Sequence, residues 1–416
     1  MLKQDRVLFY FFPVLIMGFI VTGLVYSGTS AITGFIAIQL QPARLISDFI
    51  MTEGIGAALV NSAAVGLVGY IFILAAGTRL SGPTFAAVFT MMGFGLFGKT
   101  PVNIIPVLAG VILSAKFVYK GLKDYIIIAL FGTALGPLVS TAAVEIGLTG
   151  AAAVLGGAFG GVVTGFLLPA LAVSMLHLHQ GYNLYNMGLT CGFLSLFLAS
   201  LIKAGGVPLE GIMSWHAENP PLLILLVPVL SLFLILLALI GGGKSSLSSF
   251  VKILKKPGRL PSDFIDMTSV WGAFINSGLI GLIGSAYVYF IGADFNGPVI
   301  GGLLTVMGFA AFGTHLKNAW PVVAGVIIAA LLFGKPLTAP GVILAAIFCT
   351  TLAPIAGQFG IIPGVIAGFL HLVMVSQTGS WQGGMNLYNN GFAGGMTAAL
   401  IVAVAQWYKT NRQKDE

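Results

Sequence analysis

An internal repeat constrains the fold of this chain more than any other feature of its sequence. Residues 42–111 align without a gap with residues 257–326, and 28 of the 70 aligned pairs are identical. The identities include asparagine, glycine and proline as well as apolar residues. The alignment ends on the tetrapeptide NLYN, which begins at Asn183 and again at Asn386. Two copies of one structural unit therefore make up most of the chain.

Each copy is too apolar to fold in water. The chain is 57% hydrophobic and only 7% charged, whereas a soluble domain carries about 25% charged residues. Its apolar runs are long enough to cross about 30 Å of hydrocarbon. We therefore predict an all-α membrane protein with about 14 transmembrane segments, seven in each copy. The segments lie near 7–26, 54–77, 80–98, 103–119, 124–146, 153–177 and 184–203, and near 221–242, 269–292, 297–313, 318–334, 340–357, 360–376 and 387–408.

These segments give the domain organisation. We expect the first repeat over 1–203, an extracytoplasmic linker over 204–220, the second repeat over 221–408 and a cytoplasmic tail over 409–416. The run at 7–26 follows two basic residues, as in a signal peptide, but no cleavage sequence of the AxA type comes after it. We interpret this run as a retained first helix.

An odd number of segments places the two copies in opposite orientations, and the charges agree. Five basic residues, from Lys244 to Arg259, follow the first segment of the second copy, where the first copy has only Arg44. Conversely, Arg79 in the first copy corresponds to Asp294 in the second. Since basic loops tend to stay in the cytoplasm, we predict two inverted-topology repeats in the cytoplasmic (inner) membrane, with both termini cytoplasmic.

Inverted repeats are the common plan of secondary transporters. The 7+7 arrangement resembles that of nucleobase, sulfate and bicarbonate transporters, which implies that the third helix of each repeat is a broken or half helix at the substrate site. The twinned SGP…MGF…FG and NLYN elements resemble those of a prokaryotic membrane-protein family named domain of unknown function 1576. That second resemblance implies a multipass membrane protein and gives no substrate.

The third segments are the first candidates for a binding site. Each is 18 residues long and opens with a Gly-Pro pair, at Gly82 and Pro83 and at Gly297 and Pro298. Proline is tolerated in the first turn of a helix, so each pair could begin a half helix whose N–H groups face an anionic or polar group. Two ordinary helices that begin at the membrane surface are the alternative.

Amides and hydroxyls inside apolar segments supply the other candidate ligands. They are costly in hydrocarbon, so each must bond to a solute or to a neighbouring helix. The NLYN asparagines could cap the following helix, or form a polar elbow that lines the solute path. The candidates are Asn61, Ser62, Thr90, Asn276, Ser277 and Thr305, together with Asn183, Asn186, Asn386 and Asn389 of the NLYN elements.

Ionisable residues are sparse, and they give the candidates for coupling or gating. Arg44 and Asp48 match Arg259 and Asp263, and the spacing of four residues permits an ion pair on an interfacial helix or loop. We expect these pairs to anchor or gate the protein. The candidates for proton coupling are Asp266, Glu145 and His177.

These features favour a secondary carrier or uniporter for a small polar or anionic solute, with a proton or sodium ion as the candidate coupling ion. A passive solute or ion channel is the alternative. An enzyme is disfavoured because the five histidines and two cysteines show no catalytic or metal-binding spacing, so we expect no cofactor and no metal. The net charge is +7, but the basic residues are few and lie between apolar runs, so we expect no nucleic-acid partner. The partners expected are the solute and the lipid bilayer, and glycine-rich surfaces leave a homodimer open.

Overall fold

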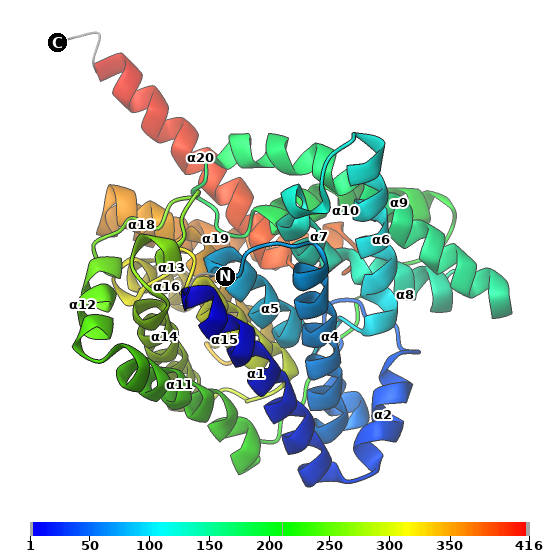
Figure 1. Ribbon diagram of the computed structural model, residues 1–416. Coiled ribbons are helices and arrows are strands. Elements are labelled where there is room, and N and C mark those ends of the chain that lie inside the picture. The colour runs from blue at the N-terminus through cyan, green and yellow to red at the C-terminus, as the bar shows by residue number, and fades with distance from the viewer. Residues whose placement is uncertain (1–2, 210, 413–416) are drawn as a thin grey trace.

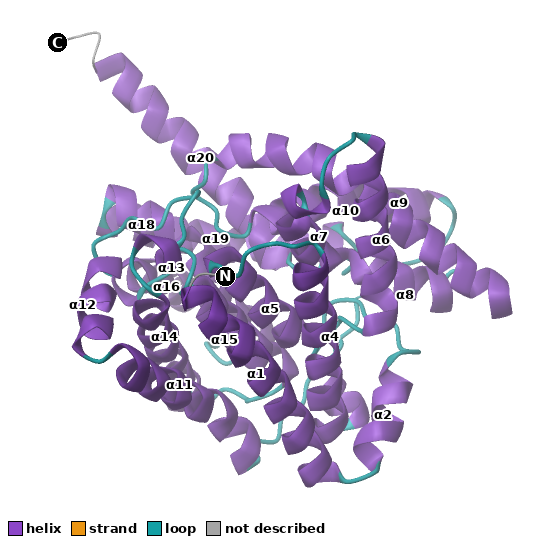
Figure 2. Cartoon of the chain, in the orientation of Figure 1, coloured by secondary structure: helices purple, strands orange, loops and turns teal. Residues whose placement is uncertain are grey.

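The computed structural model describes residues 3–209 and 211–412. Figure 2 shows that this part of the chain consists of helices joined by loops, without strands. Ten helical stretches in it are long and apolar enough to cross a membrane. The third and fourth predicted segments of each repeat form shorter helices, of 13 and 17 residues. The protein is therefore a multipass membrane protein, although helix length alone supports ten crossings rather than fourteen.

The two halves of the chain contain the same α-helices in the same order. Each helix of the first half is followed here by its counterpart in the second half. The pairs are α1 (Lys3–Ser27) and α11 (Pro221–Gly242), α2 (Ser30–Ile38) and α12 (Lys244–Ile253), α3 (Phe49–Glu53) and α13 (Phe264–Met267), α4 (Ile55–Ala75) and α14 (Val270–Phe290), α5 (Gly82–Phe94) and α15 (Gly297–Phe309), α6 (Pro101–Phe117) and α16 (Leu316–Leu332), α7 (Ile126–Gly132) and α17 (Pro340–Phe348), α8 (Gly136–Val144) and α18 (Ala353–Phe359), α9 (Gly150–His179) and α19 (Ile361–Trp381), α10 (Asn186–Ala204) and α20 (Asn389–Arg412).

Several boundaries differ from the predicted segments. The short helices α2 and α12 were not predicted, and the stretch 39–48 before α3 is not helical. Each fifth segment is split by a 3-10 turn, because the next helix begins with Pro137 or Pro354 within its first two residues and proline lacks an N–H donor. Helix α20 continues to Arg412, so much of the predicted tail is helical, while Lys414 lies outside the described residues.

Glycines let neighbouring helices touch through their backbones. A Cβ atom on Gly165 would lie 2.1 Å from the carbonyl oxygen of Val107 where α9 crosses α6, and one on Gly368 would lie 1.8 Å from that of Val322 where α19 crosses α16. Helices α5 and α15 pack against each other near the centre of the molecule (Figure 1). At that crossing a Cβ on Gly93 would lie 2.4 Å from the carbonyl oxygen of Gly301. Such contacts are typical of membrane helix packing.

Helices α4 and α14 run in opposite directions between two ends of the molecule. Arg79, just after α4, forms an ion pair with Asp266, just before α14, at 2.8 Å. Asp48, which precedes α4, accepts a hydrogen bond from the N–H of Gly297, which follows α14. Because each helix has 21 residues, these ends are about 31 Å apart. We call the end with Arg79 and Asp266 the Asp263 face, and the end with Asp48 and Gly297 the Asp48 face.

Candidate functional site

A cavity of about 750 Å³ lies between the two repeats. Its wall is mostly apolar with a few polar groups, which is the usual make-up of a small-molecule site. Seven of the lining side chains are aromatic, and six of them form three pairs of repeat-related positions. These pairs are Phe94 and Phe309, Phe131 and Phe348, and Tyr185 and Tyr388. Both repeats therefore build the same cavity.

The cavity reaches the protein surface at the Asp263 face. Its lining there includes Met267, which is 50% exposed, and Asp266, which is also exposed. None of the residues 39–54 or 205–220 lines it, among those that the structure describes. The linker between the repeats instead covers the Asp48 face, where the N–H of Ile46 donates to the carbonyl of Ile212 at 2.8 Å. The cavity is thus open at one end and covered at the other.

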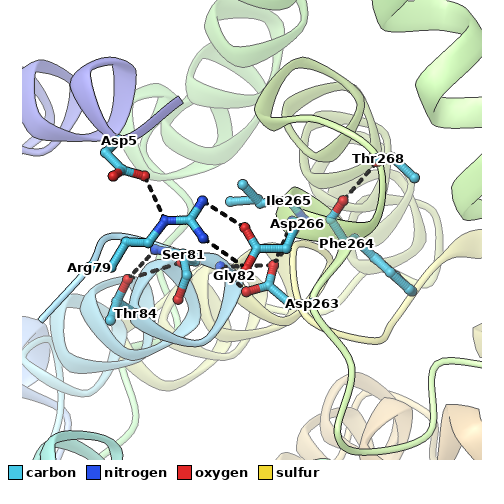
Figure 3. A network of polar contacts seen from close by, with 10 residues as sticks. All are labelled: Asp5, Arg79, Ser81, Gly82, Thr84, Asp263, Phe264, Ile265, Asp266 and Thr268. Atoms are coloured by element: carbon cyan, nitrogen blue, oxygen red, sulfur yellow. Dashed lines mark hydrogen bonds and ion pairs between the residues drawn. The ribbon is translucent and has the colours of Figure 1, made fainter. Parts of the chain in front are cut away.

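Two aspartates tie each repeat to the other at the start of α5 and α15. The N–H of Gly82 donates to both carboxylate oxygens of Asp263, at 3.1 and 3.2 Å, and the N–H of Gly297 donates to Asp48 at 3.2 Å. Both helix N-termini, which were predicted to face an anionic group, therefore face a carboxylate of the chain itself. Figure 3 shows the Asp263 tie. Burial raises the pKa of Asp48 and of Asp263 from 3.8 to about 6, despite these backbone hydrogen bonds.

An ion-pair network lies beside the Asp263 tie at the mouth of the cavity. Arg79 donates to Asp5 at 3.0 Å and to Asp266 at 3.2 Å (Figure 3). It thereby links the start of α1 to the stretch that leads into α14. Asp266 was predicted as a proton-coupling residue, and the structure places it in the cavity wall with its charge balanced by Arg79.

The NLYN elements form two elbows that are tied to each other. The side-chain amide of Asn183 donates to the carbonyl of Gly391 at 3.1 Å, and that of Asn386 donates to the carbonyl of Gly188 at 3.3 Å. Each of these asparagines also accepts a hydrogen bond from the backbone N–H two residues later. The predicted polar elbow is present, and its first asparagine joins the repeats rather than capping a helix by itself.

The second asparagine of each element holds the elbow to the preceding helix. Asn186 donates to the carbonyl of Ala172 at 3.1 Å, and Asn389 donates to that of Val375 at 3.4 Å. The Asn186 oxygen also lies 2.9 Å from Nε2 of His179, which is fully buried. Of the four NLYN asparagines, Asn186 lines the cavity.

The elbows also bond to the interrupted fifth segments. The N–H of Leu184 donates to the carbonyl of Thr351 at 2.9 Å, and the N–H of Leu387 donates to that of Ala134 at 3.1 Å. These carbonyls belong to the 3-10 turns of the opposite repeat. The repeat-related sequences TALGP, at 133–137, and TTLAP, at 350–354, overlap these turns. In the structure the helix breaks expose the backbone acceptors that the elbows use.

The asparagines of α4 and α14 bond to neighbouring backbone. Asn61 donates to the carbonyls of Gly95 and Lys99 at 2.6 and 2.8 Å, and Asn276 donates to those of Ala310 and Thr314 at 2.7 and 2.8 Å. Ser62 donates to the carbonyl of Met92, and Ser277 is fully buried. All four side chains lie outside the cavity wall, and Asn61, Ser62 and Asn276 satisfy carbonyls near the ends of α5 and α15.

The ion pairs predicted for Arg44 with Asp48 and for Arg259 with Asp263 do not form. Both oxygens of Asp48 accept backbone hydrogen bonds, and Arg44 pairs with Glu145 at 2.6 Å. Arg259 donates to the carbonyl of Gln180 and lies 4.4 Å from the ring centre of Tyr182. The stretches before α3 and α13 are irregular rather than helical, so residues four apart are not brought together on successive turns of a helix.

Lys99 is a functional candidate that the sequence analysis missed. It is fully buried, and its Nζ donates to Thr133 Oγ1 at 2.6 Å and to the Tyr388 hydroxyl at 2.5 Å. It follows the third segment directly in FGKTPVN, in the short interval between the predicted segments 80–98 and 103–119. A lysine between two short membrane segments was the available signal.

The candidate residues fall into two groups. Six of them line the cavity, and they come from both repeats. These are Pro83, Thr90, Asn186, Asp263, Asp266 and Thr305. The others support the wall or lie at the faces, and His177 is exposed at the end of α9. The coupling candidates are thereby separated, since Glu145 pairs with Arg44 on the Asp48 face.

Helices of this length and apolarity, around a shared internal cavity, define a multipass integral membrane protein. The chain belongs to the family described as "Protein of unknown function (DUF1576)", which matches residues 27–204 and 243–407. The match covers both repeats and includes both NLYN elements. No curated protein and no solved structure matches the chain.

Proposed function

We propose that this protein is a secondary carrier or uniporter that moves a small polar or anionic solute across the cytoplasmic membrane. The observation that carries the proposal is the cavity between the repeats, which is walled by both and reaches one face. A solute site at the interface of two related repeats is the usual arrangement in secondary transporters.

The proposed topology has fourteen crossings in two inverted repeats. The antiparallel run of α4 and α14 supports it, because Arg79 after one helix meets Asp266 before the other. The four shorter helices α5, α6, α15 and α16 complete the count. Arg79 and Arg259 lie on the Asp263 face, whereas Arg44 on the Asp48 face is paired with Glu145. The positive-inside tendency then puts the Asp263 face and both termini in the cytoplasm.

A carrier fits the cavity better than a passive channel does. A channel needs a continuous path, whereas none of the described residues of the Asp48 face, 39–54 and 205–220, lines this cavity. Because the repeats are related by sequence, exchanging their conformations would close the Asp263 face and open the Asp48 face. Such an exchange is the rocking motion by which inverted repeats give alternating access. A coupling proton or sodium ion would meet Asp263 and Asp266, the two carboxylates in the wall.

Filling the cavity should abolish solute uptake without unfolding the protein. Uptake into proteoliposomes is measured for nucleobases, carboxylates, amides, inorganic anions and alkali cations, after screening the same panel by thermal stability. A ligand at about 100 times its dissociation constant adds about 2.7 kcal/mol of stability. We expect Thr305→Phe, inside the cavity, to lose uptake of any solute found.

The matched control is Ile240→Phe, at a side chain that is 83% exposed on the lipid-facing helix α11. It should transport normally. Normal uptake by a folded Thr305→Phe variant would show that the cavity is not the solute path.

A further inference from the structure

The side-chain amine of Lys99 is buried beside the cavity, away from any counter-ion that the structure describes. Its side chain is fully buried, and its two hydrogen-bond partners are the hydroxyls of Thr133 and Tyr388. Within residues 3–209 and 211–412, no carboxylate forms an ion pair with it. A charge taken out of water needs a compensating charge. We therefore ask which negatively charged group balances the charge of Lys99.

The acidic groups of the cavity do not supply it, because each has other partners. Asp263 accepts hydrogen bonds from the backbone N–H groups of Gly82, Ile265 and Asp266. The carboxylate of Asp266 pairs with Arg79. Lys99 is therefore the group that leaves positive charge uncompensated next to this cavity.

The wall presents this charge to the cavity through Tyr388. Tyr388 lines the cavity, and its hydroxyl oxygen accepts a hydrogen bond from Lys99, which leaves the hydroxyl proton for a second acceptor. Lys99 Nζ lies 4.6 Å from the ring centre of Tyr388 and 5.7 Å from that of Phe94, both of which face the cavity. A hydrogen-bond acceptor at the Tyr388 hydroxyl would thus be connected to Lys99 Nζ through that hydroxyl group.

A buried hydroxyl group of the cavity wall lacks a hydrogen-bond partner among the described residues. Thr90 is 2% exposed, and its hydroxyl makes no hydrogen bond with the described residues. An unpartnered buried hydroxyl in a cavity wall indicates a ligand group or water. Most of the wall around Thr90 is apolar, and Phe94, Phe309 and Phe131 supply broad aromatic surfaces.

The second repeat provides a natural comparison. The positions equivalent to Lys99, Thr133 and Tyr388 are Thr314, Thr350 and Tyr185. Thr314 is fully buried, like Lys99, and it is uncharged. One half of the site therefore carries a charge that its repeat-related half lacks.

We propose that the cavity binds an organic monoanion, with a carboxylate at Tyr388 near Lys99 and an apolar or aromatic body between the phenylalanines. This inference rests on the proposed transport function, since it names the substrate class of the same cavity. The carboxylate accepts the proton of the Tyr388 hydroxyl in a hydrogen bond, and Lys99 gives the compensating charge. A neutral amide of the same shape has no negative charge for Lys99 to balance.

Binding of benzoate and benzamide to the detergent-purified protein tests this proposal. We expect benzoate to raise the melting temperature and to bind at least ten times more tightly than benzamide. Acetate and hexanoate extend the series at constant charge. If no carboxylate binds, or if benzamide binds as well as benzoate, the proposal is wrong.

Lys99→Thr is the variant that separates charge from shape, because the chain itself has threonine at the equivalent position. It should bind benzoate at least ten times more weakly, and Tyr388→Phe should also weaken binding. Thr314→Val is the matched control at the uncharged position and should bind benzoate as the wild type does. Unchanged benzoate affinity in both Lys99→Thr and Tyr388→Phe would overturn the proposal.

Uptake of labelled benzoate into proteoliposomes tests the transport function separately from the anion site. Binding that depends on Lys99 without any uptake would reject the transport function and keep the anion site. Uptake that does not depend on Lys99 would keep the transport function and reject the anion site.

Discussion

Replacing Gly368 by alanine is expected to prevent the native contact between α16 and α19. The new Cβ would lie 1.8 Å from the carbonyl oxygen of Val322 and 2.8 Å from its carbonyl carbon. These are backbone atoms of a helix, so no side-chain rotation relieves the overlap and the two helices must separate. We expect the free energy of unfolding to fall by about 3 kcal/mol, at the upper end of the range for overpacking. The melting temperature and the monodisperse fraction after detergent extraction measure it.

Gly18→Ala is the matched control for this prediction. Gly18 also lies within a long helix, α1, but a Cβ there has no neighbouring atom within 4 Å. Alanine should be neutral there, or stabilising by up to about 1 kcal/mol through its higher helix propensity. Equal melting temperatures for Gly368→Ala and Gly18→Ala would contradict the close backbone contact between α16 and α19.

Asp48→Ala is expected to be the more damaging of two equivalent substitutions. Its carboxylate is fully buried and accepts hydrogen bonds from the N–H groups of Ile50, His216 and Gly297. Without it, three donors lose their acceptor, and each unsatisfied buried group costs about 1–3 kcal/mol. We expect a loss of about 3 kcal/mol or more at pH 7.5, measured by thermal unfolding in detergent.

Asp263→Ala is the control for the Asp48 substitution, because Asp263 caps the equivalent helix from the other repeat. Asp263 is only half-buried and lines the open mouth of the cavity, so water can replace its oxygens. Asp263→Ala should therefore lower the free energy of unfolding by less than Asp48→Ala does. If the two variants lose the same stability, the two faces do not differ in solvent access as the structure indicates.

The sequence predicts the parts of this fold that depend on local chemistry. Long apolar runs gave the membrane helices, and the Gly-Pro pairs marked the start of the short helices α5 and α15. The repeated NLYN indicated a polar elbow, because asparagine is costly in hydrocarbon unless it is bonded. Each of these conclusions uses residues that lie close together in the chain.

The partners of these residues could not be predicted in the same way. Gly82 bonds to Asp263 across 181 residues, and Asn183 bonds to the carbonyl of Gly391 across 208 residues. A spacing of four residues suggested an ion pair of Arg44 with Asp48, but the backbone there is not helical and Arg44 pairs with Glu145 instead. The repeat shows which positions are equivalent, and it does not show which of them meet.

Alternating access of the cavity from the two membrane faces is the central claim, and thiol labelling tests it most directly. Cys191 and Cys349 are both buried, and they are replaced by alanine so that single cysteines can be introduced. Lys252→Cys on α12 and Met51→Cys on α3 mark the two faces. Thr305→Cys reports on the cavity wall. A membrane-impermeant reagent is applied to vesicles of each orientation in turn.

We expect the two marker cysteines to react from opposite sides of the membrane. The cysteine at 305 should react from either side, and a bound solute should slow the reaction from both. Markers that react from the same side would contradict the inverted repeats. A cysteine at 305 that reacts only from the side of the Asp263 face, with and without solute, would contradict alternating access.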